Sequence, residues 1–282
     1  MTAEIERRPP PEIEAIGERF GVMRLRFVDD TGIASVWRGV HERFGDVAMK
    51  TFHDPGVGDE QRAAGLLRAY GGVGAARLYQ ASEAALVMEF LPGERLGDLC
   101  RRGEDAAASR ILGDVARRLH ALNARVDARP LTDVLEGLLR EDLGAIEDDT
   151  FRGQMRAACA EAKALLSEPA PQIVLHGDLH FDNVLRTERG WLAIDPKCYL
   201  GDPAFELANA FRNPKGAEAL VADPERIQRL AADFSAALNV DRRRLLRWAA
   251  VKCAHSLRLA FLKSGVWSRG AAPLPQLLEA AQ

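Results

Sequence analysis

The chain has 282 residues, of which 47% are hydrophobic and 28% charged, so it can bury a substantial core as one large domain or two lobes. Its formal net charge of -3 at pH 7 gives no general attraction to nucleic acid or to an anionic membrane, because both favour a basic surface. Neither kind of partner is expected, and any partner must be argued from a particular site.

The cysteines and the N-terminal segment indicate the compartment. Cys100, Cys159, Cys198 and Cys253 lack the paired spacing of a zinc site, a redox motif or a disulfide framework. Residues 1–11 are charged where a secretion signal needs an apolar core, and no apolar run approaches the roughly 20 residues of a membrane span. We therefore expect a reduced, cytoplasmic protein.

The first part of the chain combines short β-rich runs with two helical patterns. The expected strands are Met23–Val28, Ala34–Val40, Val47–Phe52, Ala76–Gln80 and Ala85–Phe90, and the expected helices are Ile13–Phe20 and Asp59–Tyr70. Five strands with a helix between the third and the fourth are typical of the small N-terminal lobe of a kinase.

The second part is mostly helical and begins after Pro92-Gly93, which marks a hinge. Apolar residues recur at helical spacing in Ala106–Leu122, Leu131–Ile146, Arg152–Leu166, Pro224–Leu238 and Arg242–Lys263, and short β-like pieces occur at Gln172–Leu175, Val184–Leu185 and Trp191–Ile194. We predict an α+β fold of two lobes: a nucleotide-binding lobe with a small antiparallel sheet in residues 1–91, and a larger helical lobe in residues 92–282 that carries the catalytic loop and the substrate pocket.

The β-like pieces bracket the segment His176-Gly-Asp-Leu-His-Phe-Asp-Asn183, and Asp195-Pro196 follows it. Phosphoryl transfer needs a carboxylate beside the attacking hydroxyl, an amide oxygen for one Mg²⁺ and a second carboxylate for the metals. Asp178, Asn183 and Asp195 supply these groups in order. We predict that Asp178 accepts or orients the hydroxyl proton and that Asn183 and Asp195 bind Mg²⁺.

Two histidines in this segment suggest a second possibility. His176 and His180 are four residues apart and would share one face of a helix, as zinc ligands can. The glycine between them and the flanking β pattern favour a loop, and no third ligand follows at a useful spacing. Hydrogen bonds that hold the loop are the preferred interpretation, with His180 near the phosphates.

Lys50 is the upstream counterpart of this segment. It lies in Val47-Ala48-Met49-Lys50, where a lysine among apolar neighbours is costly unless it has an anionic partner. Glu60, at the start of the next helix, is the expected partner, and Asp59 is the competing one. A lysine on the third strand paired with a glutamate on the following helix positions the α and β phosphates of ATP in kinases.

Two further segments are candidates for nucleotide contacts, because the chain has neither a G-x-G-x-x-G nor a P-loop sequence. The turn Asp29–Ser35 would cover the phosphates with backbone amides and the Thr31 or Ser35 hydroxyl, although it also fits a plain polar hairpin. The hinge segment Glu89–Leu91 would offer backbone groups to a purine. ATP is the expected nucleotide, and GTP is not excluded.

The motifs resemble the aminoglycoside phosphotransferase family, which shares the protein kinase-like fold. His176-Gly-Asp-Leu-His-x-x-Asn183 and Ile194-Asp-Pro196 are similar to the family's catalytic motifs. More narrowly, Trp191–Lys197 and Gly201–Asn209 resemble the streptomycin 6-kinase and hydroxyurea phosphotransferase branch, as do the Gly74–Leu78 segment and the helix that begins at Glu60. The resemblance covers residues 36–260.

The resemblance implies ATP-dependent O-phosphorylation of a small molecule, with Asp178 as the catalytic aspartate and Lys50 and Glu60 as the nucleotide-positioning pair. Lys197 matches a lysine common in that branch and is expected to contact a phosphate or a neighbouring acid. Asp202 and Glu206 either contact the substrate or serve as charge and packing at the start of a helix at residues 203–211, where Arg212 would answer one of them.

Substrates of the streptomycin type are cationic, so an acidic pocket is expected. One run carries seven carboxylates against Arg140 alone: Asp133, Glu136, Glu141, Asp142, Glu147, Asp148 and Asp149. This run would concentrate a cation, or it is merely a solvated helix face.

The leading hypothesis is therefore an antibiotic-resistance kinase of the streptomycin 6-kinase type. The alternatives are a kinase for an amino alcohol or a sugar, and a catalytically silent kinase-like binding module. A protein kinase is disfavoured, because Phe-Gly does not follow Asp195 and no long activation segment precedes Gly201.

Overall fold

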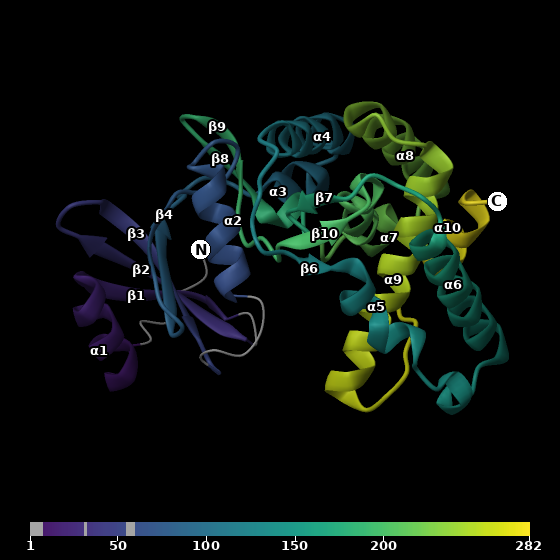
Figure 1. The fold of residues 1–282 in the computed structure, drawn as a ribbon, viewed down its shortest axis with the longest axis horizontal. Coiled ribbons are helices and arrows are strands. Elements are labelled where there is room, and N and C mark those ends of the chain that lie inside the picture. Colours follow the sequence, from purple (N-terminus) through teal and green to yellow (C-terminus); the bar gives the residue numbers. More distant parts are fainter. Residues whose placement is uncertain (1–7, 31–32, 55–59) are drawn as a thin grey trace.

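The computed structural model describes residues 8–30, 33–54 and 60–282, with the backbone but not the side chain of Glu60. A five-stranded antiparallel sheet forms one side of the molecule, and helices form most of the other (Figure 1). The helix α2, Glu60–Tyr70, lies between the two parts in this view.

The sheet has the strand order β1-β2-β3-β5-β4. Its strands are β1 Val22–Asp30, β2 Ala34–His41, β3 Gly45–Phe52, β4 Leu78–Ala81 and β5 Ala85–Glu89. The central strand β3 pairs Lys50 with Val36 on β2 and with Leu86 on β5. Because β3 has a neighbour on each side, the backbone that carries Lys50 is held by two ladders of hydrogen bonds.

The two faces of the sheet are covered differently. The helix α1, Pro11–Phe20, packs Ile13, Ile16 and Phe20 against a cluster that includes Trp37 and Met49. Residues of α2 instead join the large core of the helical part. This second helix therefore connects the sheet to the rest of the molecule through apolar packing.

The helical part is built around one continuous apolar core. Its helices are α3 Leu96–Arg101, α4 Asp105–Ala121, α5 Leu131–Leu139, α6 Asp149–Ser167, α7 Glu218–Val221, α8 Pro224–Leu238, α9 Arg242–Ser264 and α10 Leu274–Ala280. Aromatic rings connect these helices with the short turns after residue 200: Phe205 packs edge-on against Trp248 of α9, and Phe211 edge-on against Phe234 of α8.

Short strands support the segment 176–183. The strand β7, Ile173–Leu175, pairs antiparallel with β10, Tyr199–Gly201, which also pairs with β6, Arg129–Pro130. The hairpin of β8, Val184–Thr187, and β9, Gly190–Ala193, follows the segment. The Ala76 amide donates to the Ala193 carbonyl at 2.9 Å, so this hairpin is joined to the chain that leads into β4.

The observed elements depart from the predicted ones in two places. The helix expected over residues 131–146 ends at Leu139 and is followed by a 3-10 turn, Leu143–Ala145, which Asp142 caps by accepting the Gly144 amide. The helix expected over residues 203–211 is two 3-10 turns, Pro203–Phe205 and Ala208–Arg212. In both regions an aspartate side chain accepts a backbone amide and starts a short turn in place of a continuous α-helix. The spacing of apolar residues contains no information about such caps.

The remaining differences are α3, α7, α10, β6 and β10, which the sequence did not suggest and which have seven residues or fewer. Among the described residues, no helix combines the length and the apolar character needed to cross a membrane.

Phe234 tests the packing of the helical core, since its side chain is fully buried between Phe181 and Phe211. Phe234→Ala should lower the free energy of unfolding by about 3–5 kcal/mol, through lost burial and the cavity that remains. Leu262→Ala, at a position 57% exposed, is the control and should change it by less than about 0.5 kcal/mol. Urea titration followed by circular dichroism measures both, and equal losses would contradict the assigned core.

Candidate active site

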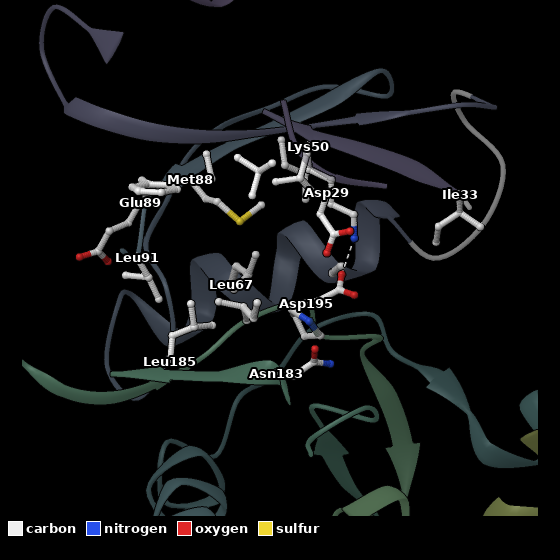
Figure 2. A pocket seen from close by; sticks show the side chains of 18 of the residues that line it. Asp29, Ile33, Lys50, Leu67, Met88, Glu89, Leu91, Asn183, Leu185 and Asp195 are labelled. Carbon is white, nitrogen blue, oxygen red and sulfur yellow. Dashed lines mark hydrogen bonds and ion pairs between the residues drawn. The ribbon is translucent and has the colours of Figure 1, made fainter. Parts of the chain in front are cut away.

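A cavity of about 490 Å³ lies between the sheet and the β8–β9 hairpin. Apolar side chains line most of it, and polar ones gather at one end around Lys50, Asn183 and Asp195 (Figure 2). The apolar lining includes Val28, Val36, Ala48, Leu67, Leu86, Met88, Leu91, Leu185 and Ile194. Such a cavity fits a flat aromatic group with a charged tail, because dispersion holds the ring and the polar end fixes the orientation.

The charged end of the cavity is an ion pair between two distant parts of the chain. Lys50 on β3 donates to Asp195, and Lys197 Nζ lies 3.3 Å from the second oxygen of the same carboxylate. Burial alone would raise the pKa of Asp195, but the two lysines outweigh it and hold this pKa below its usual range. The carboxylate therefore stays ionised at neutral pH, as a metal ligand must.

The predicted ion pair of Lys50 with Glu60 falls partly outside the described residues. Glu60 begins α2, but its side chain lies outside the described residues, as do Asp59 and Thr31. The observed partner of Lys50 is Asp195, and Asp195 has a φ of 58°. A non-glycine residue in the left-handed region is strained, and such strain is found most often at functional sites.

Asp178 lies on the loop after β7 and is held from three sides. Its carbonyl accepts the Asn183 side-chain amide at 3.0 Å, and its Oδ1 accepts the Asn209 side-chain amide at 2.8 Å. Lys252 Nζ of α9 lies 3.9 Å from the same Oδ1. The contact with Asn183 joins the predicted base directly to a predicted metal ligand.

Gly177 explains how this loop fits. Its φ is 81°, and a β-carbon there would lie 2.7 Å from the ring of Tyr199. Any other residue would be strained and would clash, so the glycine serves the backbone conformation.

His176 and Glu206 form a buried frame under the loop. Glu206 accepts the backbone amides of His176 at 2.9 Å and Gly177 at 3.0 Å, and it bonds His120 of α4 at 2.9 Å. Burial would raise the pKa of Glu206, but His120, His176 and the Gly177 amide together outweigh it, and the net pKa is lowered. Glu206 thus holds the loop through its backbone, and both of its carboxylate oxygens accept hydrogen bonds from within the protein.

The ring of His176 is also committed to the frame. Its Nε2 donates to the Ile194 carbonyl at 3.0 Å, and its Nδ1 accepts the Asp178 amide at 3.3 Å. Burial lowers the pKa of His176, which agrees with this neutral form. Both nitrogens are occupied, so the zinc alternative is excluded for His176. His180 caps the next turn by accepting the Asp182 amide at 3.2 Å.

Asp202 serves the second role that the sequence allowed. Its carboxylate accepts the Ala204 amide at 2.9 Å and the Trp248 indole N–H at 2.7 Å, and it pairs with Arg244. These contacts cap a turn and hold α9. They occupy both carboxylate oxygens of Asp202, which favours the structural role over contact with a substrate. Arg244 pairs with Asp202, and His120 bonds Glu206. Arg212 had been expected to pair with one of these acids.

Of the three other predicted nucleotide contacts, Glu89 and Leu91 line the cavity and Ser35 does not. The hydroxyl of Ser35 donates to Asp30 at 3.1 Å and lies 3.1 Å from His53. Glu89 accepts the Arg77 amide at 3.2 Å and pairs with Arg189, while Leu91 contributes its side chain to the apolar lining. Figure 2 shows Glu89 and Leu91 at the end of the cavity opposite Asp195.

Five of the seven acids in the run 133–149 pair with an arginine or cap a turn or helix within the described residues. Glu141 pairs with Arg258, Asp149 with Arg152, and Glu136 with Arg140. Asp142 and Asp148 cap the elements that follow them. The pairs of Glu136 and Asp149 lie on a solvated surface, whereas the pair of Glu141 with Arg258 of α9 is largely buried.

Asn209 and Lys252 are the site residues that the sequence analysis did not select. Lys252 carried the same signal as Lys50, a lysine within the apolar run Ala249-Ala250-Val251-Lys252-Cys253-Ala254. Asn209 ends the Gly201–Asn209 motif, but a side-chain amide gives no indication of its partner. Both contacts reach across the fold from segments that follow the loop.

The family to which the chain belongs is decided by a family model that matches residues 27–261, described as aminoglycoside/hydroxyurea antibiotic resistance kinase. This chain belongs to that family. It is 37% identical to the streptomycin 3''-kinase of Klebsiella pneumoniae over 201 residues, which cover 68% of the chain and 72% of that kinase. It is 33% identical to the streptomycin 6-kinase of Streptomyces griseus over 66% of the chain and 62% of that kinase.

A third relative of the chain is named for a different acceptor. The hydroxyurea phosphotransferase of Kitasatospora aureofaciens is 40% identical over 154 residues, which cover 52% of the chain and 45% of that protein. The resemblance to the streptomycin 6-kinase and hydroxyurea phosphotransferase branch is thereby confirmed.

Solved structures of more distant kinases confirm the fold. The amicoumacin kinase hAmiN superposes with a TM-score of 0.69 at 12% identity and covers 96% of this chain and 93% of its own. An aminoglycoside phosphotransferase solved with AMP-PNP and hygromycin B gives 0.64 at 14% identity, over 95% of this chain and 97% of its own. The predicted α+β, protein kinase-like fold with a sheet lobe and a helical lobe is therefore correct.

Glu206 offers a test of the buried frame. At pH 7, Glu206→Gln should lower the free energy of unfolding by about 2–3 kcal/mol, because a neutral amide cannot accept all three hydrogen bonds of the carboxylate. A group whose pKa is lowered on folding stabilises above its unfolded pKa, and this stabilisation is lost as the pH falls through the folded value.

The difference between wild type and Glu206→Gln should therefore persist at neutral pH and shrink below the ordinary glutamate pKa of about 4.3. Denaturant titrations over a range of pH measure it, with Glu225→Gln on the surface as the control. A difference that grew on acidification would contradict the assigned frame.

Proposed function

We propose that this protein transfers the γ-phosphate of ATP to a hydroxyl of streptomycin or a related aminocyclitol antibiotic. The chain is a phosphotransferase of the antibiotic resistance kinase family, with a small molecule as its acceptor. One observation carries the proposal: Lys50, Asn183 and Asp195 meet at the polar end of one cavity, and the Asn183 side chain bonds the backbone of Asp178.

The cavity supports a division of labour between the lobes. We assign nucleotide binding to residues 1–91, with the purine against the apolar lining near Glu89–Leu91 and the phosphates towards Lys50. Residues 92–282 would carry the catalytic loop and the acceptor. His180 and Lys197 lie on the phosphate side of this arrangement, because Lys197 contacts Asp195 and His180 turns the chain before Asn183.

The donor set at this end suits a divalent cation, and Mg²⁺ is the proposed one. Asp195 offers an ionised carboxylate, and Asn183 donates its side-chain N–H to Asp178 and so keeps its amide oxygen for a ligand. Mg²⁺ binds hard oxygens and commonly takes one or two protein ligands, with phosphate and water oxygens in the other positions. When bound, it would neutralise charge that develops on the phosphates.

Asp178 is the proposed base. Its carboxylate is kept ionised because Lys252, His180 and Lys197 outweigh the effect of burial, which alone would raise its pKa. It would accept the proton of the acceptor hydroxyl as that oxygen attacks the γ-phosphorus. Asn183 and Asn209 fix its backbone and one carboxylate oxygen, so the base is oriented before the acceptor arrives.

Two properties of the acceptor remain part of the proposal. The acceptor is proposed to be cationic, as streptomycin is, with its charged groups directed away from Lys252. The two streptomycin kinase relatives have names that specify different hydroxyls, so the position of transfer is left open. We also propose a cytoplasmic enzyme, since ATP is abundant there and all four cysteines are free thiols.

Asp178→Asn tests the base. The variant should lose about 10²–10⁴-fold in kcat and should still bind Mg-ATP, because the change removes a proton acceptor and leaves the cavity intact. Asp114→Asn, an exposed position, is the control. Product is measured by mass spectrometry with streptomycin and a panel of aminocyclitols, amino alcohols and sugars.

The panel separates the candidate functions. Phosphorylation of an amino alcohol or sugar alone would replace the antibiotic assignment with a metabolite kinase. Absence of any product, together with no thermal shift on adding Mg-ATP, would support a silent binding module and sink the proposed function.

Asp195→Ala tests the metal site. It should raise the Mg²⁺ concentration that gives half-maximal activity by at least about 10-fold, because the remaining amide oxygen is a weak ligand. Activity measured against Mg²⁺ at saturating ATP gives this value. An unchanged Mg²⁺ dependence would show that the metal is held elsewhere.

A further inference from the structure

The two oxygens of the Asp178 carboxylate have different surroundings. Oδ1 accepts the Asn209 amide and faces Lys252, whereas Oδ2 accepts no hydrogen bond from the described residues. The second oxygen is therefore the one available to the acceptor hydroxyl. Lys252 and Asn209 both approach Oδ1, at 3.9 Å and 2.8 Å.

Lys252 is an unusual residue for its position. It lies midway along α9 and is only 8% exposed, and its ammonium donates no hydrogen bond within the described part of the chain. Burial lowers its pKa, Arg212 and Lys197 act in the same direction, and Asp178 opposes them. A buried ammonium with a single carboxylate at 3.9 Å has unused donors, and leaving them unused is costly.

A second orphaned group adjoins it. Asn209 Oδ1 is buried and has no hydrogen-bond partner among the described residues, although the amide nitrogen of the same side chain is bonded to Asp178. Buried polar atoms are nearly always satisfied, so the unused donors of the Lys252 ammonium indicate an acceptor that a ligand supplies. The open oxygen of Asn209 needs a donor, which a phosphoryl group does not have, so it bears on the acceptor molecule instead.

The charge around Lys252 indicates the kind of group that is missing. Lys197 contacts Asp195 at the end of the cavity. Its positive charge also lowers the pKa of both Asp178 and Lys252. Lys252 lies beside the carboxylate that would take the hydroxyl proton, whereas Lys50 is already paired with Asp195. The transferring phosphoryl group is anionic and passes next to this carboxylate, so its oxygens can accept from the unused donors of Lys252.

We propose that Lys252 is a further catalytic residue, whose ammonium binds an oxygen of the phosphoryl group as it passes from ATP to the acceptor. The inference rests on the proposed phosphoryl transfer. In that step the acceptor oxygen forms a bond to the γ-phosphorus, and the bond from that phosphorus to the bridging oxygen breaks. The electron pair leaves with ADP, and the hydroxyl proton moves to Asp178 Oδ2. Lys252 balances charge on the phosphoryl oxygens throughout, which positioned cations do in such reactions.

A structural role is the competing explanation, in which Lys252 only neutralises the buried Asp178. The two explanations differ in what Lys252→Met should do. Loss of Lys252 should raise the pKa of Asp178 under either explanation, because its charge opposes the effect of burial. A catalytic lysine predicts a kcat about 10²–10³-fold lower that stays low at high pH, where Asp178 is ionised, with a KM for ATP within about twofold of wild type. A lysine that only neutralises Asp178 predicts a kcat that returns towards the wild-type value as the pH rises.

The experiment compares wild type, Lys252→Met, Lys252→Arg and the exposed control Lys263→Met, which lies on the same helix. Steady-state kinetics use the acceptor that wild type phosphorylates, so failure of the proposed function is recognised first, by an inactive wild type. Lys252→Arg should keep more activity than Lys252→Met because it retains the charge, and Lys263→Met should match wild type.

A binding measurement complements the kinetics. ADP, Mg²⁺ and aluminium fluoride with the acceptor mimic the phosphoryl group in transit, and this mixture should raise the melting temperature of wild type but not of Lys252→Met. Both proteins should respond equally to ADP and Mg²⁺ alone. If Lys252→Met keeps the aluminium fluoride response, or loses no kcat, the proposal is wrong.

Discussion

The ion pair between Lys50 and Asp195 is the interaction on which the site depends. It joins the central strand of the sheet to the segment that follows β9 in the helical part. A lysine buried in a sheet and an aspartate in a strained left-handed conformation are each unfavourable alone. Together they satisfy one another, and they hold the polar end of the cavity where its two walls meet.

A second set of buried contacts holds the loop that carries Asp178, the proposed base. Glu206 gathers two backbone amides of the 176–177 segment, and His176 connects the same segment to the Ile194 carbonyl just before Asp195. The loop that carries Asp178 and the loop that carries Asp195 are therefore parts of one hydrogen-bonded unit. This rigidity suits a reaction in which the protein mainly positions and neutralises charge.

The charges around Asp178 also bear on acceptor recognition. Carboxylates of the acidic run pair with arginines or cap turns and helices, whereas Lys252 lies near Asp178, the proposed base. Recognition of a cationic antibiotic would consequently depend on groups farther from the reacting hydroxyl. That arrangement is consistent with a family whose members bear names as different as streptomycin kinase and hydroxyurea phosphotransferase.

The sequence by itself determined the strands and most of the long helices, because the spacing of apolar residues within a short segment indicates which face of a helix or strand is buried. It also determined the family, because the spacing from His176 to Asn183 and the Asp195-Pro196 pair lie within short continuous motifs. Lys50 was selected from its apolar neighbours together with its position upstream of the Asp178 segment.

Only the tertiary structure decided which charges meet. It paired Lys50 with Asp195, gave Asp202 and Glu206 internal partners, and brought Asn209 and Lys252 to Asp178. Such contacts join segments far apart along the chain, and their geometry depends on how helices and loops pack. Local periodicity carries no record of that packing, so an isolated carboxylate or lysine in the sequence does not reveal its partner.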